Sequence, residues 1–339
     1  MLGEKLLIKL WDTLAKDGIG SLASPWQIKR EGKAHAEVRR DEMLMIAQAE
    51  VEVAKIKQGK AKCLPDGKLV ELNCSGSVAS QDSQGRIEPT LNLKSFSEKI
   101  EQQNKAEEIQ QEININKTIS LAEEELLRSK QEPSDKDIDS DWLHRWRDHA
   151  KTTNNDELRQ IWARTLAGEI KAPGSYSLRT LEFIKNLSQE EAQAISKLGK
   201  FAINRSIFKC PHLETQGINF SFLLQMDDLG IVNGVQGGTV SGLEFSFASG
   251  KTDKFENNLV NRNQILLIEG EDPNKKVKLG CYQISKIGSE VLSLGDFSAD
   301  DVYMKEIGEI IKKQGFDVKI ALWVQTNGEY GQYFNARSI

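Results

Sequence analysis

Residues 157–170 read ELRQIWARTLAGEI, and this stretch decides how the middle of the chain folds. Its apolar residues recur three and four positions apart, which is the spacing of one face of an α-helix. They are Leu158, Ile161, Trp162, Leu166 and Ile170. Asn154, with Glu157 three residues later, is typical of a helix N-cap, and Pro173-Gly174 ends the run. We therefore expect an amphipathic helix that packs by this face.

Further helices are expected on both sides, and together they predict a helical domain over residues 138–200. Upstream, Trp142, Leu143 and Trp146 lie on one face of a preceding helix. Downstream, Ser188-Gln189-Glu190-Glu191 has the pattern of a capping box, in which the first and fourth residues cap the helix reciprocally. The short connections between these helices predict a compact helical array.

The same region resembles a family of uncharacterised bacterial proteins, known as a domain of unknown function and often encoded in prophages or variable genomic regions. The resemblance covers roughly residues 140–295. A looser similarity, over about residues 155–200, is to the alpha-type abortive-infection domain. The residues that carry the resemblance are 157–170, 173–175, 177–181 and 187–192. It implies a role in phage–host conflict and provides no catalytic residue.

Four residues of this motif have two interpretations that the sequence leaves open. They are Trp162, Arg164, Glu169 and Arg179. In one interpretation they pack and cap the helical hairpin. In the other they form a surface that contacts a protein partner of phage or host origin.

The first 132 residues are expected to form a long-helix arm, with a loop at 61–92 that can fold back as a hairpin. Helices are predicted over 26–59 and 93–130, because these stretches are rich in good helix formers and contain no proline. Ile115, Ile119, Ala122 and Leu126 form a narrow apolar seam on the second helix. Two long polar helices bury little apolar area alone. We therefore expect them to pack on each other or on another chain, which predicts a homo-oligomer.

Two features of the arm raise binding alternatives. The basic residues of the first long helix alternate with acidic ones, so they form either a solvated face or a phosphate-binding surface. These basic residues are Lys29, Arg30, Lys33, Arg39 and Arg40. A short amphipathic helix over 2–14 either packs on protein or makes peripheral contact with a membrane.

The C-terminal part is expected to contain a winged-helix-like module over 201–295, followed by a small helix–strand unit and tail over 296–339. In such modules a recognition helix precedes a two-stranded wing. The helix at 220–229 carries two aspartates and no Lys or Arg, which argues against docking on DNA phosphates. Lys276 and Lys278 are the alternative phosphate contacts, from the wing.

The 339 residues carry a formal charge of −5, which argues against a uniformly basic nucleic-acid coat. Four scattered cysteines and the absence of a secretory pattern predict reduced thiols in a cytoplasmic protein. We find no catalytic, metal-binding or cofactor signature; the glycine-rich run at 234–242 lacks the Lys-Ser/Thr ending of a phosphate loop and predicts a hairpin loop.

We therefore expect a mostly helical α+β protein. The sequence favours a non-enzymatic role, and a hydrolase or nuclease whose site assembles from distant residues is a further alternative. The expected role of the protein is in interaction or regulation, and it self-associates through its N-terminal helices. The alternative function is nucleic-acid binding through the basic helix and the winged-helix-like module.

Overall fold

The computed structural model describes residues 2–19, 35–64, 68–72, 93–129, 131–235, 243–327 and 330–339. Three sets of predictions lie outside these residues: Lys29, Arg30 and Lys33, most of the 61–92 loop, and the glycine-rich run from 236 to 242. The chain divides into two compact units, Met1–Pro173 and Gly174–Ile339. This boundary falls inside the helical domain expected over 138–200.

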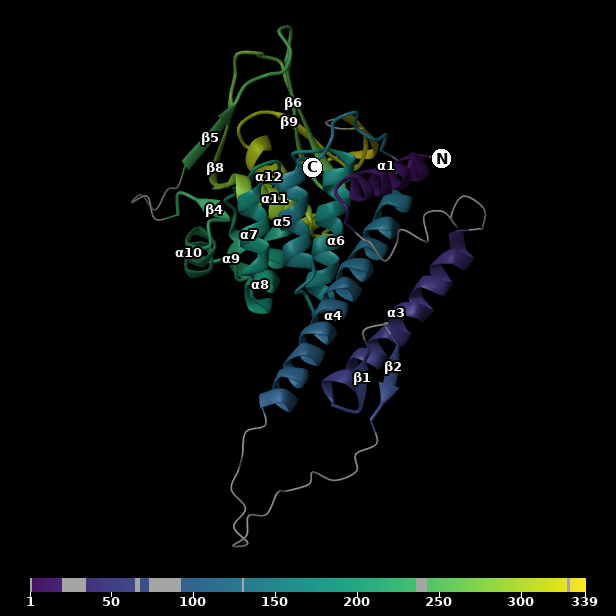
Figure 1. Ribbon diagram of the computed structural model, residues 1–339. Coiled ribbons are helices and arrows are strands. Elements are labelled where there is room, and N and C mark those ends of the chain that lie inside the picture. The colour runs from purple at the N-terminus through teal and green to yellow at the C-terminus, as the bar shows by residue number, and fades with distance from the viewer. Residues whose placement is uncertain are drawn as a thin grey trace, which may run out of the picture. The chain divides into compact units, whose positions relative to one another are not determined.

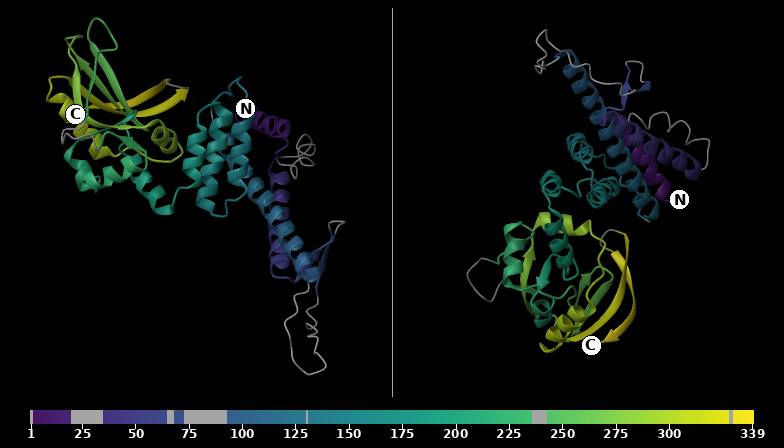
Figure 2. Two further views of the ribbon diagram at one scale, coloured as in Figure 1. Left: turned by 60° about the vertical axis from the view of Figure 1, so that its left-hand side comes forward. Right: turned by 90° about the horizontal axis from the view of Figure 1, so that it is seen from below.

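Unit 1 is built from helices, with one small antiparallel hairpin (Figure 1). The longest helix, α4 (Leu93–Arg128), lies beside α3 (His35–Lys57) in both Figure 1 and Figure 2. The other elements are α1 (Leu2–Lys16), β1 (Ala61–Cys63), β2 (Leu69–Glu71), α5 (Ser140–Ala150) and α6 (Asp156–Lys171). The hairpin β1–β2 confirms the expected fold-back within 61–72.

The seam predicted on α4 forms part of the core of unit 1. Ile115, Ile119, Ala122 and Leu126 are at most 1% exposed. Both α1 and α6 pack against α4. The apolar side chains of α1, including Leu6 and Leu10, are buried. Thus the chain's own helices cover this seam. No helix among the described residues is both long enough and apolar enough to span a bilayer.

At the two helix starts where the sequence predicts a cap, the structure places one cap a residue later and the other as predicted. The N-cap of α6 is Asn155, whose side chain accepts a hydrogen bond from the Leu158 amide. The prediction of Asn154 was therefore wrong by one position, because both residues are asparagines and only the backbone turn selects between them. Before α8 (Gln189–Gly199), Ser188 and Glu191 form the predicted capping box.

The described residues of unit 2 form two antiparallel sheets and several short helices. The first sheet has the order β3-β8-β4, with β5 also paired to β8, and the second has the order β10-β9-β7-β6. The helices are α7 (Leu178–Lys185), α8, α9 (Pro211–Thr215), α10 (Phe220–Asp228), α11 (Lys286–Ser293) and α12 (Asp301–Lys312). The strands are β3 (Ser206–Phe208), β4 (Val232–Asn233), β5 (Leu243–Phe247), β6 (Phe255–Asn261), β7 (Gln264–Gly270), β8 (Val277–Ile284), β9 (Asp317–Asn327) and β10 (Tyr330–Ser338).

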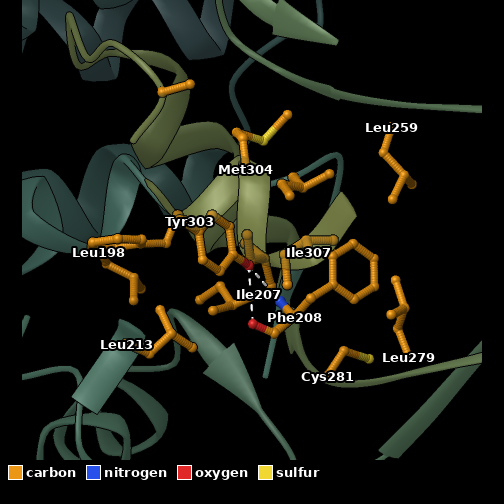
Figure 3. Packing of buried hydrophobic residues seen from close by; sticks show 14 of the residues in the cluster. Leu198, Ile207, Phe208, Leu213, Leu259, Leu279, Cys281, Tyr303, Met304 and Ile307 are labelled. Atoms are coloured by element: carbon orange, nitrogen blue, oxygen red, sulfur yellow. Dashed lines mark hydrogen bonds between the residues drawn. The ribbon is translucent and has the colours of Figure 1, made fainter. Parts of the chain in front are cut away.

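The core of unit 2 lies between α12 and the two sheets. Tyr303, Met304 and Ile307 of α12 are fully buried, together with Ile207 and Leu266 from the sheets. Figure 3 shows part of this packing around Tyr303. Because one helix packs on both sheets, the segment after residue 296 is part of the same core as the strands before it.

The C-terminal tail corrects one expectation. The last part of the segment 296–339 was expected to be a tail, but Tyr330–Ser338 form β10 and pair with β9 along its length (Figure 2). As a result β9 lies between β10 and β7 and is not an edge strand. The pairing of β10 with β9 accommodates an asparagine at a break in its register. Asn335 adopts a positive φ of 56° next to the register shift between Phe334 and Arg337.

Candidate functional site

An apolar seam on α3 has no cover among the described residues. On one face of α3, Ile46, Ala49, Val53 and Ile56 belong to the cluster formed with α4. Two positions earlier the chain repeats the same spacing of three, four and three residues, with Leu44, Ala47, Val51 and Ala54. We call these four residues the α3 seam, and all four are exposed. An offset of two residues is about 200° around a helix, so the two rows lie on opposite faces.

The exposed side chains of the α3 seam are large as well as apolar. Leu44 is 59% exposed and Val51 is 58% exposed. Met43 and Met45, which flank Leu44, are 51% and 53% exposed. The seam was not predicted from the sequence, where the apolar run from 43 to 46 was the available signal.

A pocket of about 400 Å³ lies beside α10 in unit 2. Its apolar lining includes Leu213, Ile218, Leu223 and Val235, each at most 6% exposed. These residues come from α9, the loop that follows it, α10 and the loop after β4, so no local sequence pattern predicts the pocket. Tyr282 of β8 adds an aromatic ring.

The polar groups of this pocket are few. Lys209 lines it, and its Nζ lies 4.6 Å from the centroid of the Tyr282 ring, a cation–π arrangement. Gly280 stands beside the Lys209 stem, since a Cβ at that position would lie 3.4 Å from the Lys209 Cδ. Glu214 lines the pocket and is exposed.

Cys210 also lines the pocket, and its thiol is held in the neutral form. Burial raises the pKa of Cys210 to about 12, and a hydrogen bond with the Glu306 carboxylate adds to the effect. The same carboxylate accepts a hydrogen bond from the backbone amide of His212, with 3.0 Å between the His212 nitrogen and Glu306 Oε2. A thiol with this pKa is a poor nucleophile at neutral pH, so Cys210 and His212 do not form an activated nucleophile pair.

The partner-surface candidates are dispersed. Trp162 is fully buried and Glu169 is 2% exposed, both in unit 1. The Arg164 side chain is 32% exposed, with its Nε 3.8 Å from Glu125. Arg179 is exposed on α7 in unit 2. The burial of Trp162 and Glu169 fits the packing interpretation, and neither side chain is available as a contact surface.

Four of the nucleic-acid candidates lie among the described residues. Arg39 and Arg40 belong to α3, where Arg40 is exposed. Lys278 on β8 pairs with Glu244 at 3.2 Å, while Lys276 is exposed in the loop before it. No group of three or more metal-ligating side chains occurs within the described parts of the chain.

A family model matches part of the chain. Residues 98–209 match a family of proteins of unknown function, DUF2806. The match covers about a third of the 339 residues, from α4 to the residue after β3. It agrees with the expected resemblance to a domain of unknown function, although it begins earlier and ends earlier than the range of 140–295. No curated protein matches the chain, and no solved structure matches it.

Proposed function

We propose that this protein is an interaction protein that self-associates through antiparallel pairing of α3 with α3 of a second copy. The observation that carries the proposal is the α3 seam, an exposed apolar row on the face opposite the one that α4 covers. Its spacing of three, four and three residues is that of a coiled-coil seam. The expected occupant is therefore another helix.

The order of side chains in the seam favours a second copy in the antiparallel direction. Positions 44 and 54 are equally far from position 49, and so are 47 and 51. Antiparallel pairing about this point places Leu44 of each copy opposite Ala54 of the other, and Ala47 opposite Val51. Each layer then combines a large and a small side chain, which is how facing positions fill space without voids. The contact is self-complementary, as a two-fold dimer requires.

The first half of α3 supports the need for a partner. Met43, Leu44 and Met45 are consecutive, and each is more than half exposed. Three consecutive residues spread over about 200° of the helix surface. Helical segments with little tertiary packing are marginal in water, so burial against a second chain stabilises this half of α3.

The molar mass in solution tests the proposal. Light scattering after gel filtration at tens of micromolar is expected to give twice the 38.0 kDa of the chain. Leu44→Glu places a charge in the seam and is expected to give a monomer. Ile8→Glu is the matched control, because Ile8 is 62% exposed on α1 and lies outside the seam. A monomeric wild type, or equal dissociation of both variants, contradicts the proposal.

We also propose that unit 2 contains a winged-helix-like module. The order α8, β3, α9, α10, β4 and β5, followed by β8 after the β6–β7 hairpin of the second sheet, supports this assignment, as does the place of β8 between β3 and β4. Charge disfavours a nucleic-acid function: α10 has aspartates and no Lys or Arg, and the wing lysine Lys278 is paired. Salt-sensitive binding to duplex DNA would favour the alternative function. A role in phage–host conflict is also part of the proposal, and only the resemblance described in the sequence analysis supports it.

A further inference from the structure

We propose that a second pocket, at the end of the α3–α4 pair, binds a small phosphate monoester that carries an apolar group. We call it the hairpin pocket, because the end of α3, the β1–β2 hairpin and the first part of α4 line it, all within unit 1 (Figure 1). Its volume of about 440 Å³ falls within the range of small-molecule sites, about 300–1,000 Å³.

Hydrogen bonds to the main chain hold the walls of the hairpin pocket in place. The Gln102 side chain on α4 bonds to both backbone groups of Cys63 on β1. Its Oε1 accepts from the Cys63 amide at 2.8 Å, and its Nε2 donates to the Cys63 carbonyl oxygen at 3.1 Å. The Leu72 amide, just after β2, donates to the Lys60 carbonyl oxygen at 2.7 Å. The pocket is therefore pre-formed, so binding requires little ordering of the protein.

The apolar part of the lining defines the body of the ligand. Ile56 and Ala61 line the pocket and are 5% and 2% exposed, within the cluster that α3 forms with α4. Leu72 also lines the pocket and is 47% exposed. We expect an apolar ring of the ligand to cover Leu72, because removing apolar surface from water favours binding.

Three lysines and one glutamate of the described lining define the charge of the ligand. Lys62 on β1 pairs with Glu98 on α4, with 3.5 Å between Nζ and Oε2, so these two charges offset each other. Lys57, in the last turn of α3, and Lys99 on α4 are exposed. Neither of these two side chains has a hydrogen-bond or ion-pair partner within the described ranges. The described lining therefore keeps two positive charges that no carboxylate offsets.

A phosphate monoester matches these two charges. Its phosphate group carries a charge of about −1.5 to −2 at neutral pH, whereas a carboxylate carries a single negative charge. Lysine binds phosphate as a point charge. Because Lys57 and Lys99 come from different helices and line the same pocket, we expect one phosphate group to contact both ammonium groups.

Isothermal titration calorimetry of the full chain with 1-naphthyl phosphate tests the inference. The titration is run at pH 7.5 in a phosphate-free buffer of low ionic strength, because salt screens exposed charges. Inorganic phosphate, which lacks the rings, and 1-naphthol, which lacks the phosphate, are the matched probes. We expect saturable binding of 1-naphthyl phosphate, and about tenfold weaker binding of each of the other two probes.

Lys57→Gln and Lys99→Gln are each expected to weaken binding of 1-naphthyl phosphate about three- to fivefold, which is the effect of losing one exposed ion pair. The matched control is Lys5→Gln, because Lys5 is exposed on α1 and does not line the pocket. This variant should leave the affinity unchanged. All three substitutions replace exposed side chains, so the variants should fold as the wild type does.

Glu98→Gln is expected to strengthen binding, an effect that damage to the fold could not produce. The substitution removes the carboxylate that pairs with Lys62, and it leaves a third ammonium group for the phosphate. The affinity for 1-naphthyl phosphate should therefore rise about threefold. The affinity for 1-naphthol, which has no charge to respond, should not change.

Several outcomes overturn the inference. They are the absence of saturable binding of 1-naphthyl phosphate, binding of inorganic phosphate with the same affinity, equal effects of the pocket lysine variants and Lys5→Gln, and a Glu98→Gln variant whose affinity does not rise. The titration is repeated on Leu44→Glu, which should bind as the wild type does because one chain forms the whole pocket. Loss of binding in Leu44→Glu also overturns the inference, so its outcome is distinguishable from that of the proposed self-association.

Discussion

A single hydroxyl group, that of Tyr303 on α12, satisfies both backbone polar groups of Phe208 on β3 (Figure 3). The Phe208 amide donates to the Tyr303 oxygen at 2.7 Å, and the hydroxyl donates to the Phe208 carbonyl oxygen at 3.1 Å. β3 is an edge strand of its sheet. The Tyr303 side chain therefore replaces the neighbouring strand that this edge lacks, and it ties α12 to the sheet.

Tyr303→Phe is expected to lower the free energy of unfolding by about 2–4 kcal/mol, because it leaves a buried N–H and a buried C=O without partners. Urea unfolding followed by circular dichroism measures the change. Tyr333→Phe is the control, since Tyr333 is 52% exposed on β10 and its loss should cost less than about 0.5 kcal/mol. If both variants lowered the free energy of unfolding equally, the two hydrogen bonds of the Tyr303 hydroxyl would not contribute to stability as we expect.

The Cys210 thiol makes stability depend on pH in the alkaline range. Its pKa is about 12 in the folded chain against an ordinary value of 9.0. Above pH 9 the unfolded chain therefore loses this proton before the folded chain does. The contribution is fully present below pH 9 and decreases as pH rises toward 12. Burial also raises the pKa of Tyr303 well above its ordinary value, which adds a decrease above pH 10.

Alkylation measures the state of the Cys210 thiol directly. At pH 8.5, iodoacetamide should modify Cys210 in the native chain far more slowly than in urea, because the thiolate is the reacting form. Glu306→Gln removes the carboxylate that contributes to the raised pKa and should speed the native reaction. Peptide mass spectrometry provides both rates. Native and unfolded rates that agree would contradict the raised pKa.

Much of the fold is predictable where a pattern is local. The capping box at Ser188 and Glu191, and the strands Leu243–Phe247 and Val277–Ile284, follow from side-chain chemistry within a few residues. β6 and β10 were missed because the sequence of β6 includes Asn257 and Asn258, and that of β10 includes Gly331. Pairing with β7 and β9 overrides these weak local preferences.

The candidate sites were less predictable than the fold. The pocket beside α10 forms where α9, α10, β8 and the loop after β4 lie side by side. These elements are far apart in the sequence, so no local residue pattern predicts the pocket. The α3 seam was present in the sequence as a row of apolar residues. Only the structure shows that α4 covers the opposite row, which leaves Leu44 and Val51 exposed.

Glu290 on α11 is expected to be important for the stability of unit 2. Its Oε2 accepts hydrogen bonds from the Ser177 amide at 2.7 Å, the Ser177 hydroxyl at 3.0 Å and the Thr180 hydroxyl at 2.5 Å. Thr180 is fully buried. Glu290→Ala leaves the Ser177 amide without its acceptor at the start of α7 and removes the acceptor that the Ser177 and Thr180 hydroxyls share, so it should cost about 2–4 kcal/mol in thermal or urea unfolding.

Lys286→Ala provides the control for Glu290. The Lys286 ammonium lies 3.8 Å from the other Glu290 oxygen, and the lysine side chain is 76% exposed. An exposed ion pair of this kind contributes at most about 1 kcal/mol, so the variant should remain close to wild type. If Lys286→Ala were as destabilising as Glu290→Ala, the hydrogen bonds from Ser177 and Thr180 to Glu290 would not be the source of the effect.

Disulfide trapping tests the central claim, antiparallel pairing of α3, most directly. Chains carrying Ala47→Cys are mixed with chains carrying Val51→Cys, mildly oxidised and digested, and the linked peptides are identified by mass spectrometry. Antiparallel pairing places position 47 of one copy opposite position 51 of the other, so the mixed 47–51 disulfide should dominate. Predominance of 47–47 and 51–51 disulfides, or the absence of links between these positions, would contradict the account.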